Sequence, residues 1–569
     1  MYIIARDGSG DFTSIQAAVD AVDTSERAPT ILLVRMDEYH ERVVVNKDNI
    51  RIVGEDRDRT VITNSACARD LGPDGKEKGT FLSFTMIVTG RNVEVENLTV
   101  RNDAGDGSVV GQAVAVYAAG DRGVWRNCRL IAAQDTLFCG PTMPKVEKEI
   151  FPRASTAQCV ESCGDCPPTQ ARQYFENCFI RGDVDFIFGP YRCWFEGCTL
   201  YMNARGGMYT AANTPEKQPW GMVFHNCVLT GECGEGQAYL GRPWRSFART
   251  LFLECEMDEH VSPRGFLDWD EKRPVTERYG EWRTRGAPAS QETRHPRQKR
   301  MTDEEAAAVT LRQVIGGFDD WRPDRRVPTW YLCGDSTMAN YGEESCPMTG
   351  WGQALKKLVP ENVYVENCAV NGRSSKSFIA EKRLGFIELC LRPGDRLIVS
   401  FSHNDEKSDP LRYTSPRVTF PEYLGMYLDA ARRQGAEAVL ATPVARRHYG
   451  PDGRLMYTHG DYPAAMRDLA SKCGVKCLDL EAATMAMFEK EGPEGTARLF
   501  CHVPAGNRNY PEGLRDDSHL QFAGAVRVAQ LFLAMDAGMT VETARAPEAR
   551  RDDIRDLVLR EDSVYAPGR

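Results

Sequence analysis

Two aspartates interrupt apolar runs in the first half of the sequence. Asp135 lies in Gln-Asp-Thr-Leu-Phe, and Asp185 lies in Asp-Val-Asp-Phe-Ile-Phe-Gly. Two carboxyl groups held close together do not titrate independently, so one is ionised while its neighbour keeps a proton near neutral pH. Such a pair supplies a nucleophile and a general acid. The reaction that this combination favours is acyl transfer from an ester.

Three further polar residues suit the same chemistry: Gln112, Gln134 and Arg242. An arginine beside the ionised carboxylate keeps it charged and oriented, and glutamine amides can donate hydrogen bonds to a developing oxyanion. Taken alone, each of these residues is more simply explained as a solvent-exposed residue on the face of a strand. Their joint spacing favours a site, because Gln112 and Gln134 are 22 residues apart and Asp135 and Asp185 are 50 apart.

A second set of reactive residues lies in the other half of the chain. Ser336 directly follows a strand-like run, and Asp516 and His519 are three residues apart. A histidine base can activate the serine hydroxyl while the carboxylate holds the imidazole tautomer. The backbone N–H groups of Ser336 and Gly372, with the side chain of Asn404, could form an oxyanion hole. Ser336 alone would more readily be a capping residue, but the set favours a nucleophile.

The aspartates, glutamines and arginine of the first half are far apart in the sequence, so a scaffold must bring them together. A repeat in the sequence predicts such a scaffold. Between residues 31 and 270, apolar runs end in x-Asn-Cys-x-apolar or a close variant. Alignment on Leu98, Cys128, Cys178, Cys198, Cys227 and Cys255 gives intervals of 30, 50, 20, 29 and 28 residues. This recurrence predicts a stacked β-solenoid, with the cysteines as an internal packing column rather than a metal or redox centre. Neighbouring turns lie about 4.8 Å apart, so the polar residues could converge.

The 50-residue interval is interpreted as one turn plus an excursion around residues 141–168. This excursion contains Cys159, Cys163 and Cys166. Their spacing can hold zinc or a cluster when a fourth ligand exists, but no partner of matching spacing is evident. An ordinary loop with free thiols is favoured, and metal or redox chemistry is the alternative. Ahead of the coil, Ser14 caps an expected helix that seals the open end of the solenoid.

The second half predicts a parallel sheet with helices on both faces, because strand-like and helical patterns alternate. The expected strands cover 329–333, 363–370, 395–402, 436–444 and 476–480, and the expected helices cover 352–358, 375–391, 421–434, 462–471 and 521–535. Ligands bind at the carboxyl ends of such strands, where the polar clusters fall. Domains are expected at 1–323 and 329–540, with a linker at 324–328 and a charged tail at 541–569. Thr302 begins a capping-box helix that we assign to the first domain.

Composition limits the possible classes. A chain of 569 residues is too long for one core, and 42% hydrophobic and 27% charged residues with a mean hydropathy of −0.44 leave no place for a membrane class. The net charge of −10 argues against nucleic acid as a partner. No secretory signal is seen at the start, and 19 cysteines is an odd number, so a cytoplasmic location without disulfides is expected.

Residues 3–323 resemble the pectin methylesterases. The motifs, in family order, are Asp7-Gly-Ser-Gly-Asp-Phe, Glu38-Tyr-His-Glu, Gly111-Gln-Ala-Val, Gln134-Asp-Thr-Leu-Phe, Gly182-Asp-Val-Asp-Phe-Ile-Phe-Gly and Leu240-Gly-Arg-Pro-Trp. The resemblance implies a right-handed parallel β-helix in which Asp185 attacks a galacturonate methyl ester. Asp135 would protonate the departing methanol and then activate water.

The same resemblance implies roles for the other residues of the first domain. Gln112 and Gln134 would stabilise the oxyanion, and Arg242 would position Asp185. Trp244 would stack on a sugar ring, with Phe138 and Phe188 also in the substrate site. No metal or cofactor is required. Asp37 and Phe138 depart from the usual family pattern without touching the acid, the nucleophile or the arginine. Since the chain is acidic overall, a uronate substrate would need local arginines.

Residues 329–538 resemble the SGNH (GDSL-like) hydrolases, in their rhamnogalacturonan acetylesterase branch. The motifs are Leu332-Cys-Gly-Asp-Ser-Thr-Met-Ala, Gly350-Trp-Gly, Asn371-Gly-Arg-Ser-Ser-Lys-Ser-Phe, His403-Asn-Asp, Thr442-Pro-Val-Ala-Arg-Arg and His519-Leu-x-x-x-Gly-Ala. The resemblance implies an α/β/α, flavodoxin-like domain that removes acetyl groups through a serine nucleophile. Ser402 stands where the family often has glycine and is expected to narrow the mouth of the pocket.

The sequence therefore predicts a bifunctional esterase acting on methylated and acetylated pectic oligosaccharides, with no nucleic-acid or membrane partner. One alternative is a carbohydrate-binding β-solenoid with a single active esterase domain. Another is a pectate lyase or polygalacturonase on the same fold. Lyases usually need a calcium-binding carboxylate cluster.

Overall fold

A computed structural model of the chain describes residues 1–24, 28–150, 171–270, 276–286 and 293–539. The chain divides into two compact units, residues 1–326 and 327–569, and the division falls within the segment expected as the linker. We describe each unit by itself. The expected tail at 541–569 and the three cysteines Cys159, Cys163 and Cys166 lie outside the described residues.

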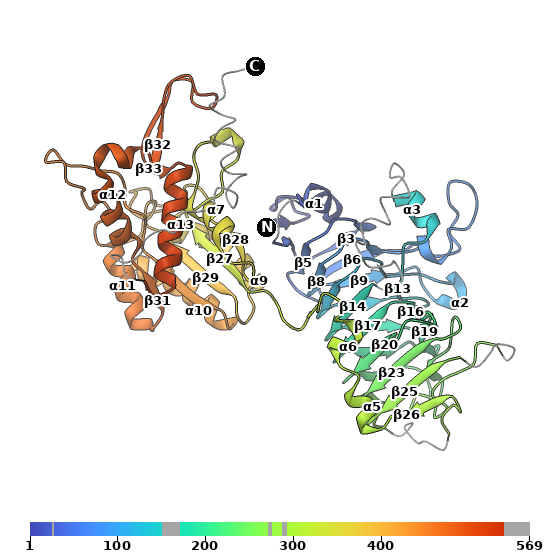
Figure 1. The fold of residues 1–569 in the computed structure, drawn as a ribbon. Coiled ribbons are helices and arrows are strands. Elements are labelled where there is room, and N and C mark those ends of the chain that lie inside the picture. The colour runs from blue at the N-terminus through green and yellow to red at the C-terminus, as the bar shows by residue number, and fades with distance from the viewer. Residues whose placement is uncertain (25–27, 151–170, 271–275, 287–292, 540–569) are drawn as a thin grey trace. The chain divides into compact units, whose positions relative to one another are not determined.

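The first unit is a parallel β-helix in which most turns of the chain give one strand to each of three sheets (Figure 1). The first sheet contains, in spatial order, β1 (Tyr2–Ile4), β2 (Thr30–Val34), β5 (Ile50–Gly54), β8 (Val93–Glu96), β11 (Gly123–Arg126), β14 (Arg172–Glu176), β17 (Arg192–Glu196), β20 (Met222–His225), β23 (Arg249–Leu253), β25 (Arg278–Trp282) and β26 (Gln298–Arg300).

The other two sheets complete each turn. The second contains β24 (Glu256–Met257), β21 (Val228–Gly231), β18 (Thr199–Met202), β15 (Phe179–Gly182), β12 (Arg129–Ile131), β9 (Thr99–Asn102), β6 (Thr60–Asn64) and β3 (Asp37–His40). The third contains β22 (Ala238–Gly241), β19 (Gly207–Ala212), β16 (Ile187–Gly189), β13 (Leu137–Cys139), β10 (Val116–Ala118), β7 (Met86–Val88) and β4 (Val43–Val45). The predicted solenoid is confirmed.

The x-Asn-Cys motif marks the corner between the first and second sheets. Asn127 and Asn177 have φ values of 48° and 51°, in the left-handed region that asparagine tolerates better than most residues. Asn127 Nδ2 also donates a hydrogen bond to Asn97 Oδ1 of the preceding turn, at 2.8 Å. The cysteine that follows each asparagine therefore points into the core. This explains why the motif or a close variant, such as Gly197-Cys198 and Glu254-Cys255, recurs at this corner of successive turns.

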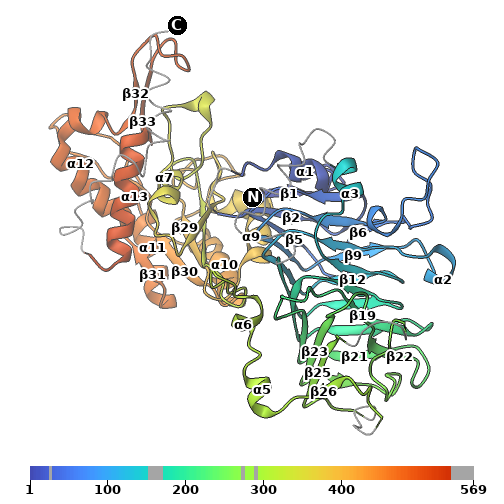
Figure 2. The same ribbon diagram turned by 45° about the vertical axis from the view of Figure 1, so that its right-hand side comes forward.

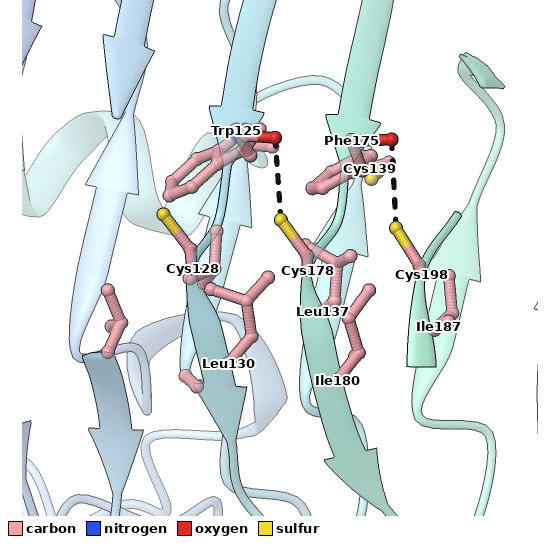
Figure 3. Close-up of a cluster of buried hydrophobic side chains, with 14 of the residues drawn as sticks. Trp125, Cys128, Leu130, Leu137, Cys139, Phe175, Cys178, Ile180, Ile187 and Cys198 are labelled. Carbon is pink, nitrogen blue, oxygen red and sulfur yellow. Dashed lines mark hydrogen bonds between the residues drawn. The ribbon is translucent and has the colours of Figure 1, made fainter. Parts of the chain in front are cut away.

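The cysteines form a buried column, as the repeat predicted (Figure 3). Cys178 Sγ lies 3.4 Å from the carbonyl oxygen of Trp125, and Cys198 Sγ lies 3.6 Å from that of Phe175, each on the preceding turn. Beside them the Phe175 and Phe195 rings stack with centroids 4.6 Å apart. The repeated side chains therefore bind successive turns together by continuous packing.

Short helices accompany the coil. They are α1 (Ile15–Ala21), η1 (Thr80–Leu82), α2 (Gly107–Val110), α3 (Pro144–Ile150), α5 (Asp303–Ala307) and α6 (Leu311–Ile315). Ser14 caps α1 through a 3.2 Å hydrogen bond from the Ala17 N–H, and Thr302 forms the expected capping box with Glu305. Among the described residues, no helix is long and apolar enough to span a membrane.

Arg172 ties the segment after α6 to the side of the coil. Its side chain is 1% exposed and donates to both carboxylate oxygens of Asp121 and to Asp319. Removing one member of a buried, multiply bonded ion pair leaves an uncompensated charge. We expect Arg172→Ala to lower the free energy of unfolding by about 3–5 kcal/mol in urea titrations followed by tryptophan fluorescence.

The matched control for Arg172 is Arg129→Ala. Arg129 forms an ion pair with Asp58, and both side chains are substantially exposed, so the expected loss is below about 1 kcal/mol. Equal losses in the two variants would show that the buried pairing of Arg172 contributes nothing special to stability.

The second unit contains a five-stranded parallel sheet in the order β28 (Tyr364–Asn367), β27 (Thr329–Gly334), β29 (Arg396–Ser400), β30 (Glu437–Ala441) and β31 (Lys476–Leu478). Figure 1 labels β27 and β28, and Figure 2 labels β29, β30 and β31. This second-first-third-fourth-fifth order is the flavodoxin-like arrangement, whose switch point lies between β27 and β29. The five predicted strands are confirmed. An antiparallel pair, β32 (Phe500–Val503) and β33 (Leu514–Leu520), was not predicted.

The helices of this unit are α7 (Trp351–Leu358), α8 (Ser375–Ala380), α9 (Arg383–Cys390), α10 (Thr419–Arg433), α11 (Tyr462–Cys473), α12 (Leu480–Ala497) and α13 (Phe522–Asp536), with the short turn η4 (Glu343–Ser345). One helix expected at 375–391 is instead two, because Lys382 takes a left-handed φ of 61° and breaks it. Helix α12 was not predicted.

Two candidate active sites

The paired aspartates of the first unit lie on adjacent turns of the third sheet. β13 pairs with β16 so that Leu137 is opposite Ile187, two residues after Asp135 and Asp185 respectively. The N–H of Asp135 donates to the carbonyl of Val184 at 3.1 Å. Both aspartates have left-handed φ values, 65° and 53°, which aspartate tolerates at a corner. The register therefore brings the two side chains to one place, as their spacing predicted.

Arg242, which follows β22, binds Asp185 through two hydrogen bonds. Its Nε lies 2.9 Å from Oδ1, and its Nη2 lies 2.7 Å from Oδ2. Burial raises the pKa of Asp185, while the guanidinium acts in the opposite direction. A bidentate pair of this kind also fixes the direction of the carboxylate. Arg242 thus favours the ionised form of Asp185.

Asp135 has the stronger tendency to hold a proton. Burial raises its pKa well above the ordinary value for aspartate, and the charge of Asp185 raises it further. The two carboxyl groups are similarly buried, at 8% and 7% exposure, but only Asp185 is bonded to arginine. Their different partners favour a proton on Asp135 and the ionised form of Asp185, which suits the roles of proton donor and nucleophile.

Gln112 and Gln134 lie on neighbouring turns beside these acids. They form a parallel bridge, and Gln134 directly precedes Asp135. Both are partly exposed, and within the described part of the chain neither side-chain amide has a hydrogen-bond partner. These amides are therefore available to a ligand at the site. Amide donors in this position suit an oxyanion.

An aromatic cluster adjoins the acids, but its members differ in exposure. Phe138 and Phe188 are 1% and 4% exposed, whereas Trp244 is partly exposed and packs edge-on against Phe188, with centroids 5.8 Å apart. The expectation that Phe138 binds substrate directly is corrected, because its ring is buried by Phe81, Tyr117 and its other neighbours. Phe188 is buried as well, so the same correction applies to it, and both rings pack edge-on against Trp244.

Trp269 belongs to this site and was not singled out from the sequence. The Arg242 guanidinium carbon lies 4.2 Å from the centroid of the Trp269 ring. Such stacking restrains a guanidinium without using its donors. The sequence could have predicted this contact, because Trp269 follows Arg242 by 27 residues, which is close to one interval of the repeat.

The second unit joins Ser336, His519 and Asp516 in a hydrogen-bonded chain. Ser336 Oγ lies 2.9 Å from His519 Nε2, and His519 Nδ1 lies 2.7 Å from Asp516 Oδ2. Burial acts to raise the pKa of Asp516, but the hydrogen bonds from His519 and the backbone outweigh it and lower the pKa. Asp516 is thus ionised and orients the imidazole as a base toward the hydroxyl.

The three predicted oxyanion donors lie in segments that follow the carboxyl ends of neighbouring strands. Ser336 follows β27 and Asn404 follows β29, so the site lies at the switch point between these strands. In the described residues, the N–H groups of Ser336 and Gly372 have no hydrogen-bond acceptor within the protein. Asn404 Nδ2 donates to the Arg373 carbonyl at 3.1 Å, which holds the amide next to Gly372. The oxyanion hole stays a prediction, and these two N–H groups and the Asn404 amide are the donors available for it.

Ser402 does not line the mouth of the pocket. It is fully buried, and its hydroxyl donates to Glu406 at 2.6 Å. The expectation that Ser402 narrows the entrance is therefore wrong, since its side chain points into a buried polar network instead.

The geometry of both sites is that of carboxylic ester hydrolases. Residues 1–142 and 168–318, just over half of the chain, match the Pectinesterase family, and residues 332–525 match the GDSL-like Lipase/Acylhydrolase family. The chain therefore belongs to the pectinesterase family through its first unit and to the GDSL-like acylhydrolases through its second. It is an enzyme with two esterase domains.

Individual relatives cover each half separately. The chain is 41% identical over 202 residues to rhamnogalacturonan acetylesterase RhgT of Bacillus subtilis, covering 35% of this chain and 86% of that protein. It is 32% identical over 329 residues to putative pectinesterase 14 of Arabidopsis thaliana, covering 56% of this chain and 87% of that protein. It spans about half (54%) of probable pectinesterase/pectinesterase inhibitor 23 of the same plant, at 29% identity and over 57% of this chain.

Among solved structures, pectin methylesterase from carrot superposes with a TM-score of 0.47 and 27% identity, covering 56% of this chain and 93% of that one.

Proposed function

We propose that the first unit hydrolyses methyl esters of galacturonate residues and that the second hydrolyses acetyl esters of rhamnogalacturonan oligosaccharides. The support for the first is the bidentate Arg242–Asp185 pair beside the buried Asp135. The support for the second is the chain of hydrogen bonds from Ser336 to Asp516, with the likeness to a rhamnogalacturonan acetylesterase.

In the first unit, a carboxylate oxygen of Asp185 attacks the ester carbonyl carbon. The Gln112 and Gln134 amides stabilise the oxyanion. The bond between the former carbonyl carbon and the methoxy oxygen then breaks, and Asp135 donates its proton to that oxygen. Methanol leaves, and the galacturonyl group remains on Asp185 as an anhydride. Ionised Asp135 removes a proton from water, which attacks the galacturonyl carbon of the anhydride. This step frees the uronate and restores both aspartates.

In the second unit, Ser336 Oγ attacks the acetyl carbonyl carbon while His519 takes the hydroxyl proton. The oxyanion is held by the Ser336 and Gly372 N–H groups and the Asn404 amide. His519 then protonates the departing sugar oxygen, leaving an acetylated serine. His519 next deprotonates a water molecule that attacks the acetyl carbon. The bond between that carbon and Ser336 Oγ then breaks, His519 returns the proton to Ser336 Oγ, and acetate is released.

Both proposals can be tested by two assays on the whole chain. We expect methanol from methyl-esterified oligogalacturonate and acetate from acetylated rhamnogalacturonan oligosaccharide. Tight binding of either saccharide without release of the product would instead support a carbohydrate-binding role for that unit. Absorbance from a new carbon–carbon double bond in the product would identify a lyase.

The pH profile of methanol release follows from the two aspartates. Activity requires Asp185 ionised and Asp135 protonated, so the rate rises through the pKa of Asp185 and falls through that of Asp135. Because Arg242 favours the ionised form of Asp185, Arg242→Lys removes one of two hydrogen bonds and raises the pKa of Asp185. We expect the acid limb of kcat/KM to move to higher pH. A shift to lower pH would contradict this assignment, and Arg129→Lys, on a different sheet, serves as the control.

We also propose that the chain acts in the cytoplasm, on pectic fragments already shortened and imported. The cysteine column supports this, because its sulfurs lie within hydrogen-bonding distance of backbone carbonyls as thiols, which a reducing compartment preserves. Cell fractionation tests the proposal, and recovery of the protein outside the cell would overturn it.

A further inference from the structure

The segment between β30 and α11 is a folded loop at the catalytic edge of the second unit. Within residues 446–459, Tyr449 and Leu455 form an antiparallel bridge, and the Met456 N–H donates to the His448 carbonyl at 2.8 Å. The loop follows the carboxyl end of β30, next to β29, which leads to Asn404. It therefore lies on the side of the sheet where ligands of such folds bind.

Arg446 lies beside two segments of the serine site, one that contains Asn404 and one that contains Asp516. Its Nη1 lies 2.9 Å from Glu406 Oε2, two residues beyond Asn404. The N–H of the next residue, Arg447, donates to the carbonyl of Asp517 at 2.8 Å, one residue beyond Asp516. Arg446 is thus placed beside the oxyanion segment and the acid–base segment together.

The guanidinium of Arg446 keeps part of its donor set unused. Nη1 makes two contacts with the protein, one to Glu406 and one to the Thr458 carbonyl at 3.2 Å. Among the described residues, Nε and Nη2 have no acceptor, and the side chain is 22% exposed. These two nitrogens form the edge of a guanidinium that binds a carboxylate through two parallel hydrogen bonds.

A buried network holds this arginine in place before any ligand arrives. Glu406 accepts a hydrogen bond from Ser402 Oγ at 2.6 Å and contacts His459 Nδ1 at 2.5 Å. Around it, His403 Nε2 and Thr458 Oγ1 are buried and have no hydrogen-bond partner among the described residues. The network thus fixes the guanidinium and leaves polar atoms nearby unsatisfied. A ligand site pre-organised in this way loses little entropy on binding.

Tyr457 adds an exposed aromatic side chain to the same loop as Arg446. It directly precedes Thr458, whose carbonyl Arg446 binds, and the tyrosine is 74% exposed. A large exposed ring with a polar tip suits stacking on the face of a sugar.

We propose that Arg446 and Tyr457 form a uronate subsite of the deacetylating unit. Arg446 Nε and Nη2 bind the carboxylate of a galacturonate residue close to the acetylated one, and Tyr457 stacks on a sugar ring. This rests on the proposed function of the second unit. It also orders the two reactions, because a methyl-esterified uronate lacks the charge that Arg446 binds. Hydrolysis of the methyl ester therefore supplies the preferred substrate for deacetylation.

Three substrates test the subsite in the full chain: an acetylated rhamnogalacturonan oligosaccharide, the same oligosaccharide with its uronates reduced to galactose, and p-nitrophenyl acetate. We expect the KM of the unmodified protein to be about tenfold lower for the acidic oligosaccharide than for the reduced one. Arg446→Lys keeps a cation for Glu406 but loses the two-nitrogen edge. It should remove that difference by raising KM for the acidic oligosaccharide alone, with kcat unchanged.

Two further variants separate charge from stacking. Tyr457→Ala should raise KM for both oligosaccharides alike and leave p-nitrophenyl acetate unaffected. Arg454→Lys, an exposed substitution in the same loop, should change nothing. Equal damage by Arg446→Lys on all three substrates, or no discrimination by the unmodified protein, would overturn the subsite. Hydrolysis of p-nitrophenyl acetate but of neither oligosaccharide would instead refute the proposed function of the unit.

Discussion

Ser336→Ala is expected to lower acetate release by a factor of about 10⁴ or more, while methanol release stays unchanged. The substitution removes the only atom that can form the acetylated intermediate, whereas His519 and Asp516 keep their mutual hydrogen bond. The remaining oxyanion donors give only a small residual rate. Acetate measured from an acetylated rhamnogalacturonan oligosaccharide at saturating concentration reports the change.

The control for this variant is Ser408→Ala, an exposed serine in the same unit, which should behave as the unmodified protein. Trapping the intermediate with a slow acetyl ester should add one acetyl group to the Ser336 peptide in mass spectra. Acetate release that persists in Ser336→Ala, or an acetyl group found on another residue, would show that the nucleophile lies elsewhere.

Asp185→Asn is expected to lower methanol release by about 10⁴-fold or more and to leave acetate release intact. The amide has nearly the shape of the carboxylate but is not a nucleophile, and it cannot form the anhydride. Because Arg242 then faces a neutral partner, we also expect a loss of stability of the first unit. Thermal unfolding alongside the methanol assay separates the two effects.

Asp258→Asn, an exposed change in the same unit, controls for the substitution itself. Asp135→Asn should also slow methanol release, because the amide cannot donate the proton or activate water. Retained methanol release in Asp185→Asn together with its loss in Asp135→Asn would reverse the assignment of nucleophile and acid.

Much of the first unit is encoded locally. A left-handed corner residue followed by an inward cysteine or leucine recurs from Asn97 to Cys255, so the coil and its interval are visible in the sequence. The convergence of Asp135 and Asp185 follows from the same interval once the excursion is removed. In the second unit, alternating strand and helix patterns likewise predict the sheet and the edge where Ser336 and His519 meet.

Other features depend on contacts between distant segments. The repeat does not encode how deeply the ring of Phe138 is buried, and tertiary packing sets that ring edge-on against Trp244. The contact between Trp269 and Arg242 requires both the register of the turns and the path of a loop. The network from Ser402 through Glu406 to Arg446 joins two loops. Their separation in the sequence matches no repeat, so no sequence pattern predicts that they meet.

The sequence by itself predicted the two folds, a boundary at residues 324–328 and a candidate set of catalytic residues for each unit, because periodicity and motif order are properties of short segments. Only the tertiary structure decided which aromatic ring is exposed, which tryptophan stacks on Arg242, and where Arg446 lies. These properties depend on burial and on the relative position of loops, which no local pattern of residues specifies.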